Sequence, residues 1–128
     1  CAATRGQVEY LGVAAQEWKV ELLRKARCLV CPLNPPYYEI FGLTTIEAAG
    51  CGTPVLSTDR GAARELIQEG KTGAIVVNAE PACLEAGLKL ALACLPEDCV
   101  GWAQGFGREE MARQYLKLYQ DVANGQEW

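Results

Sequence analysis

Two carboxylates, Glu39 and Glu47, lie eight positions apart around Gly42, and these residue types could together bind a phosphorylated, hydroxyl-rich ligand. Gly42 lets the backbone turn and approach a ligand closely. The following residues, 43–50, are predicted to form a short helix, whose N-terminal N–H groups and positive dipole end favour a phosphate. Carboxylates accept hydrogen bonds from vicinal hydroxyls, so a sugar or a ribose is the natural partner of the two glutamates.

A simpler interpretation is that Glu39 and Glu47 are surface carboxylates, with Glu47 a favourable charge near a helix N-terminus. For an isolated pair at this spacing, that interpretation would suffice. Here the pair belongs to a longer pattern, 39–55, in which the helix ends in small residues and leads into a β-branched strand.

The elements that must position these residues alternate between strands and helices. Hydrophobic periodicity predicts strands at 8–11, 28–31, 54–57 and 73–77, and helices at 16–27, 43–50, 62–68, 81–95, 97–104 and 108–123. The fold class is therefore α/β, a partial Rossmann-like parallel sheet of about four strands with flanking helices. Ligands bind such sheets beyond the carboxyl ends of the strands, where Pro32 and the loop 34–38 lie.

Composition excludes several other classes of function. The net charge is −4 and the basic residues are scattered, so we expect no nucleic-acid partner. No apolar run is long enough to span a bilayer, and no signal peptide is visible, which favours a cytoplasmic protein.

The cysteines do not form a recognisable metal or disulfide pattern. They number seven, there is no histidine, and Cys28 and Cys31 fall in a strand that directs them to opposite faces. We therefore expect free thiols in a reducing compartment and no metal site.

The segment 39–55 resembles the donor-site signature of glycosyltransferase family 4, whose members are retaining enzymes with the GT-B fold. That signature is a Glu, Phe-Gly-Leu, a second Glu after seven residues, small residues and Gly-Thr-Pro-Val, and each part stands in this sequence. The resemblance continues in Val8-x-Tyr10-Leu11-Gly12, in Asp59-x-Gly61-x-x-x-Glu65-Leu66, in 69–73 and in the tail from Phe106 to Tyr119. The chain is similar to the latter part of the family's second, donor-binding domain.

The resemblance implies a role for each matching residue. Glu39 would contact the transferred sugar near the reacting carbon and is the catalytic candidate, although not a nucleophile. Donor-binding residues would be Phe41, Gly42 and Leu43 through their amides, Thr44 at a phosphate and Glu47 at the ribose hydroxyls. Tyr10, Leu11 and Gly12 would lie near the base. The substrate would be a nucleoside-diphosphate sugar, with no cofactor or metal.

The resemblance also implies that residues 1–128 are a single, incomplete domain, with sheet and helices in 1–105 and a C-terminal helix in 106–128. The acceptor domain and the Arg/Lys pair that the family places at the diphosphate lie outside the matching segment. Arg60 and Arg64 could reach a phosphate, but exposed helix cations are the simpler interpretation. The isolated chain is accordingly expected to be inactive, and the strand 28–31 to be an apolar edge that invites self-association.

Three readings remain open from the sequence. The first is the donor portion of a retaining glycosyltransferase. The second is a non-catalytic nucleotide-sugar-binding module that needs a partner chain, and the third is an interaction fragment. A UDP-sugar epimerase of the same architecture fits less well because the chain has no histidine. The stripe of Met111, Tyr115 and Tyr119 on the last helix is expected to pack on its own domain, although in the family this helix reaches toward the other domain.

Overall fold

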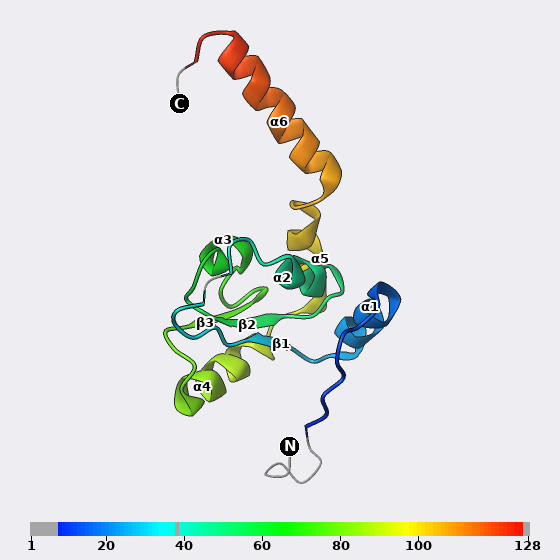
Figure 1. Ribbon diagram of the computed structural model, residues 1–128, viewed down its shortest axis with the longest axis vertical. Helices are drawn as coiled ribbons and strands as arrows, with labels where there is room; N and C mark the ends of the chain where they lie inside the picture. Colours follow the sequence, from blue (N-terminus) through cyan, green and yellow to red (C-terminus); the bar gives the residue numbers. More distant parts are fainter. Residues whose placement is uncertain (1–7, 38, 127–128) are drawn as a thin grey trace.

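The chain forms a three-stranded parallel sheet with helices on both faces, as seen in a computed structural model that describes residues 8–37 and 39–126 (Figure 1). The strands are β1 (Leu29–Cys31), β2 (Val55–Thr58) and β3 (Gly73–Val76), in the order β1-β2-β3. Leu29 is in register with Val55, and Leu56 with Ala74. Each connection contains a helix, as parallel strands require. The predicted α/β class is confirmed.

The helices are α1 (Gln16–Lys25), α2 (Leu43–Gly50), α3 (Ala63–Leu66), α4 (Pro81–Ala91), α5 (Pro96–Gln104) and α6 (Arg108–Ala123). Figure 1 shows α4 on one face of the sheet and α2 and α3 on the other. Helix α5 packs against α2. The predicted limits of α2 and α6 are confirmed. Helix α4 ends at Ala91, earlier than predicted, and residues 92–94 form a turn before Pro96 begins α5. Pro96 itself disfavours helix only in the residue before it.

The core consists of two clusters because neighbouring residues of a strand face opposite sides. Val55 packs with Leu23 of α1 and Ala48 of α2. Leu56, next in the chain, packs with Ala74 and Ala91 on the side of α4. Each of these six side chains is at most 6% exposed. The central strand β2 is buried along its length, and its carboxyl end is consequently held in a fixed position.

The prediction of a strand at 8–11 is wrong. Residues 8–12 have no regular secondary structure, and Tyr10 is 87% exposed. A strand needs a neighbour to satisfy its backbone N–H and C=O groups. In the described structure β1 pairs only with β2, and residues 8–11 do not extend the sheet along the open edge of β1. The sheet therefore has three described strands rather than four.

The expectation that α6 packs on its own domain is also wrong. None of its described side chains is buried, and Figure 1 shows the helix projecting away from the sheet. Met111, Tyr115 and Tyr119 are all more than half exposed, and Tyr115 and Tyr119 contact each other with ring centroids 6.1 Å apart. Among the described residues, no helix is long and apolar enough to cross a membrane.

Candidate functional site

The loop that follows Glu39 enters α2 through Gly42, whose φ of 84° is in the left-handed region that favours glycine. Gly42 is buried at this turn, and a β-carbon there would lie 3.2 Å from Glu39 Cγ and 3.3 Å from Leu66 Cδ1. The turn therefore brings the backbone next to Glu39 at the positive end of the α2 dipole.

A cavity of about 170 Å³ lies at the carboxyl ends of β1 and β2, between the ends of the strands and helices α2 and α3. Its polar lining includes Glu39 and Arg60, which bring opposite charges to one small space. The lining residues are Cys31, Pro32, Leu33, Glu39, Phe41, Gly42, Thr45, Ser57, Arg60, Ala62, Ala63 and Leu66. This is the edge of the sheet at which the sequence predicted a ligand.

The turn after β2 holds the backbone of the Glu39 loop in place. The Ala62 N–H donates to the Glu39 carbonyl at 3.4 Å, and a β-carbon on Gly61 would fall 1.8 Å from the same oxygen. Thr58 Oγ1 donates to the Leu33 carbonyl at 2.8 Å. These contacts fix the position of Glu39 relative to the strand ends even though its side chain is exposed.

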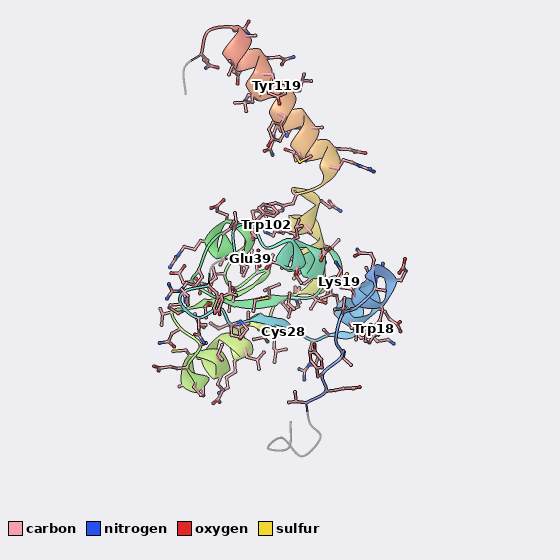
Figure 2. The ribbon with its side chains drawn as sticks, viewed as in Figure 1. Trp18, Lys19, Cys28, Glu39, Trp102 and Tyr119 are labelled. Atoms are coloured by element: carbon pink, nitrogen blue, oxygen red, sulfur yellow. The ribbon has the colours of Figure 1, made fainter. Side chains whose placement is uncertain are left out.

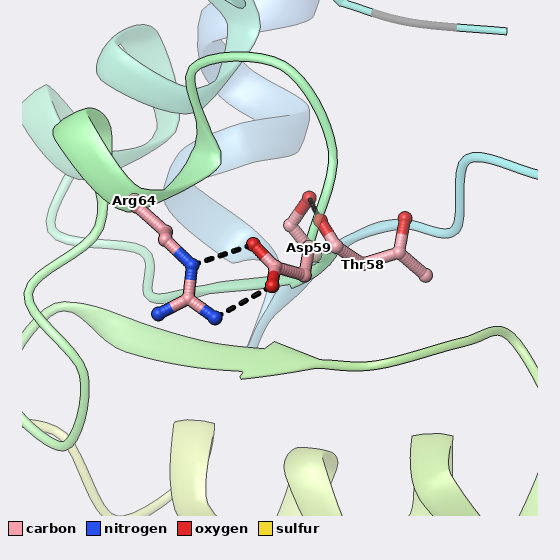
Figure 3. Close-up of polar contacts among 4 residues, drawn as sticks. Thr58, Asp59 and Arg64 are labelled. Atoms are coloured by element: carbon pink, nitrogen blue, oxygen red, sulfur yellow. Dashed lines mark hydrogen bonds and ion pairs between the residues drawn. The ribbon is translucent and has the colours of Figure 1, made fainter.

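The two arginines of this turn have different surroundings. Arg64 forms a bidentate pair with Asp59, with Nε 2.8 Å from Oδ1 and Nη2 2.5 Å from Oδ2 (Figure 3). The hydrogen bond from Arg64 lowers the pKa of the Asp59 carboxyl. Arg60 instead lines the cavity together with Glu39. The simple interpretation of both as exposed helix cations therefore holds for Arg64 but not for Arg60.

Glu47 does not line this cavity but pairs with a residue of α1. Lys19 is labelled on α1 in Figure 2. Its Nζ donates to Glu47 Oε1 at 2.6 Å, and both side chains are about one third exposed, at 30% and 33%. The two predicted carboxylates thus have separate surroundings, as the sequence indicated. Lys19 was not among the predicted site residues, because a lysine in an amphipathic helix carries no signal of its own.

Phe41 and Leu43 border a second, more open groove of about 450 Å³. Its other lining residues include Phe106 and Met111, from the segment that joins α5 to α6 and from α6 itself. Thr44 is exposed at the start of α2, whereas its neighbour Thr45 is buried and lines the cavity with Glu39. Tyr10, Leu11 and Gly12 are exposed and belong to the lining of neither space.

A chain of aromatic contacts connects α5 to the rim of the cavity. Trp102, labelled in Figure 2, lies on α5. Its Nε1 donates to the Leu66 carbonyl at 2.8 Å. The Trp102 ring meets Phe106 edge-on at 5.3 Å, and Phe106 meets Phe41 at 6.5 Å. These contacts attach α5 to two residues that line the cavity, Leu66 and Phe41. Sequence patterns did not predict this connection, because it joins segments that lie far apart in the chain.

The described cysteines are free thiols, and the spacing of Cys28 and Cys31 does not bring them to one site. Cys28 packs beside the Leu56 cluster, and Cys31 lines the cavity on the other side. Burial, together with the charge of Glu39, raises the pKa of Cys31. Within residues 8–37 and 39–126, no group of three or more cysteine, aspartate or glutamate side chains is arranged to hold a metal ion.

Residues 2–103 match the family described as Glycosyl transferases group 1, and the chain belongs to that family. The family has the GT-B fold.

Two enzyme groups appear among its relatives. The chain is 33% identical over 105 residues to a D-inositol 3-phosphate glycosyltransferase of Frankia alni, covering 77% of this chain and 26% of that protein. It is 36% identical over 93 residues to sucrose synthase 7 of Oryza sativa subsp. japonica, covering 68% of this chain and 10% of that protein. The chain thus spans about a quarter of the first relative and a tenth of the second.

Solved structures agree on the fold. Sucrose-phosphate synthase from Thermosynechococcus elongatus superimposes with a TM-score of 0.73 at 26% identity, over 94% of this chain and 31% of that one. AviGT4, a glycosyltransferase involved in avilamycin A biosynthesis, superimposes with a TM-score of 0.77 over 99% of this chain and 40% of that one. At 20% identity, this second likeness supports the fold alone.

Proposed function

We propose that this chain is the donor-binding portion of a retaining glycosyltransferase of family 4, which transfers a sugar from a nucleoside-diphosphate sugar to an acceptor. The observation that carries the proposal is the cavity in which Glu39, Arg60 and the Gly42 turn meet at the N-terminus of α2. A carboxylate, a guanidinium and the positive end of a helix dipole in one place suit a ligand that is hydroxyl-rich at one end and anionic at the other.

In this proposal, the residues that the sequence singled out bind different parts of the ligand. Glu39 accepts hydrogen bonds from the transferred sugar near its reacting carbon. The amides of Phe41, Gly42 and Leu43, with Thr44, hold sugar hydroxyls and the diphosphate at the start of α2. Glu47, one turn further along the helix, accepts hydrogen bonds from the ribose. Tyr10, Leu11 and Gly12, which are exposed in the described structure, would have to move toward the base.

The reaction would be a front-face displacement. The bond between the anomeric carbon and the diphosphate oxygen breaks, and the acceptor oxygen forms its bond on the same face. The acceptor proton passes to the departing diphosphate. The protein's contribution is electrostatic: the helix dipole and Arg60 stabilise the negative charge that develops on the leaving group. No resident metal or cofactor has a part in this scheme.

We further propose that the acceptor site is supplied by another domain or a partner chain, and that the 128-residue chain by itself turns over little donor. This proposal is supported by the coverage, because the chain spans only a minor part of each relative. The free thiols suit a reducing, cytoplasmic compartment.

Calorimetric titration with UDP-, GDP- and ADP-sugars tests the proposal. We expect one of these bases to be preferred, and Glu47→Ala and Glu39→Gln each to weaken binding. Glu85→Ala, which removes an exposed carboxylate of α4, is the matched control and should leave binding unchanged. Binding without any turnover after an acceptor domain is supplied would favour the non-catalytic module. If none of the three donors binds, the remaining interpretation is that the chain is an interaction fragment.

A further inference from the structure

The ion pair between Lys19 and Glu47 joins two helices that are otherwise fixed by packing. Helix α1 is held by Leu23, which is 6% exposed in the cluster with Ala48 and Val55. Thr53 Oγ1 also donates to the Leu23 carbonyl at 2.5 Å. These contacts position α1 against α2 independently of Lys19. The Lys19 ammonium group is therefore not needed to attach α1 to α2. We look for its role in its effect on Glu47, the carboxylate that it contacts.

The pair also differs from the intrahelical ion pairs of the surface. Lys25–Glu21 and Lys89–Glu85 are formed between residues four positions apart, and each of their side chains is more than half exposed. Such pairs add little to stability because both groups remain well solvated. Lys19 and Glu47 are separated by 28 positions, and each is about two thirds covered. The partial burial strengthens the hydrogen bond and reduces the freedom of the Glu47 side chain.

A glutamate carboxylate has two oxygens and can accept several hydrogen bonds. Lys19 engages Oε1, so the carboxylate is held in one orientation while retaining capacity to accept further bonds. A group that is already oriented loses less conformational freedom when a ligand binds. Vicinal hydroxyls, which present two donors at a fixed spacing, benefit most from a carboxylate held in this way.

We propose that Lys19 is a positioning residue: it orients Glu47 so that the carboxylate receives the two ribose hydroxyls of the nucleotide. This inference rests on the proposed function. It adds to the proposed donor site a residue from outside the 39–55 segment. Lys19 acts through Glu47 and contributes to the discrimination between a ribose and a ribose without its hydroxyls.

The test compares a nucleoside diphosphate with its 2′,3′-dideoxy analogue, using whichever of UDP, GDP and ADP the wild-type chain binds best. Calorimetry gives both dissociation constants for the wild type and for Lys19→Met. We expect the substitution to weaken ribonucleotide binding roughly tenfold, because Glu47 is no longer held in orientation and its charge-assisted hydrogen bonds with the ribose weaken, and to leave dideoxynucleotide binding unchanged. Lys19→Arg should restore most of the preference for ribose, and Lys89→Met, which breaks an exposed pair of α4, should not alter it.

An equal loss of affinity for both nucleotides would mean that Lys19 only supports the fold. No loss of affinity for either nucleotide would mean that Lys19 does not act on Glu47. Either result overturns the inference. Glu47→Gln separates this failure from failure of the proposed function. If Glu47→Gln removes the ribose preference and Lys19→Met does not, only the inference falls. If the wild-type chain binds none of the three nucleotides, the proposed function falls, and the inference with it.

Discussion

The α-carbon of Gly61 lies directly against the main-chain carbonyl of Glu39, so closely that a β-carbon on Gly61 would fall 1.8 Å from that oxygen. The φ of Gly61 is 55°, which a side chain would also disfavour. We expect Gly61→Ala to displace the Glu39 loop, destabilise the protein by roughly 1 to 3 kcal/mol and weaken donor binding more than this loss of stability explains. Thermal unfolding and calorimetric titration measure the two effects.

Gly101 provides the matched control for this substitution. It lies within α5, and a β-carbon there would meet nothing within 4 Å. Gly101→Ala should stabilise the chain by about 0.5 to 1 kcal/mol through helix propensity and leave donor binding unchanged. Equal behaviour of the two alanine variants would contradict the close contact at Gly61.

The two arginines of the 58–64 turn are expected to differ in their effect on ligand binding. Arg60 belongs to the lining of the cavity with Glu39, whereas Arg64, which pairs with Asp59, does not. Arg60→Ala should therefore weaken binding of a nucleoside-diphosphate sugar about tenfold, because a charge-assisted contact with an anionic ligand is lost. Arg64→Ala should change binding less than twofold. A larger effect of Arg64→Ala in calorimetry would contradict this assignment.

The Asp59–Arg64 pair also predicts a dependence of stability on pH. Because Arg64 lowers the pKa of Asp59 from its ordinary 3.8, the folded state binds this proton less readily than the unfolded state. The stabilising contribution is present above the ordinary value and is lost as the pH falls through the lowered pKa. Carboxyl NMR titration should show the lowered pKa in the wild type and its return toward 3.8 in Arg64→Ala. The same midpoint in both proteins would refute the pairing.

The edge strand β1 leads to a prediction about association. In the described sheet β1 pairs with β2 on one side, and Val30 at its centre is 43% exposed. An apolar edge with unpaired backbone groups promotes association between chains. We expect concentration-dependent self-association in light scattering, reduced by Val30→Lys. A wild-type chain that stays monomeric over the full concentration range would count against the prediction of self-association.

Local patterns were sufficient for much of the fold. The small-residue run after Gly42 predicted α2 with its observed limits, and proline at Pro96 and Pro81 marks the observed beginnings of α5 and α4. The strand predicted at 8–11 failed for a physical reason: alternation shows only that a segment suits a sheet, whereas a strand also needs a partner. Similarly, the stripe on α6 indicates an apolar face but not what covers it.

The candidate site was predictable only where its residues are close in sequence. Glu39 and the Gly42 turn belong to one segment, and their proximity follows from it. Ser57 and Arg60 reach the same cavity through the register of β1 with β2 and the turn that follows, which no local pattern encodes. Lys19 meets Glu47 across 28 positions, and that contact depends on how α1 packs on α2.

The order of strands in the sheet, β1-β2-β3, is also the order in which a ribosome makes them. Among the described strands, β2 and β3 each emerge when the neighbour that they pair with already exists, which keeps the separation of pairing segments short. The rim of the cavity is completed last. Leu66 receives its hydrogen bond from Trp102 only after α5 has been synthesised. During translation, a nascent chain that stops before α5 would have its sheet but not the support of its cavity.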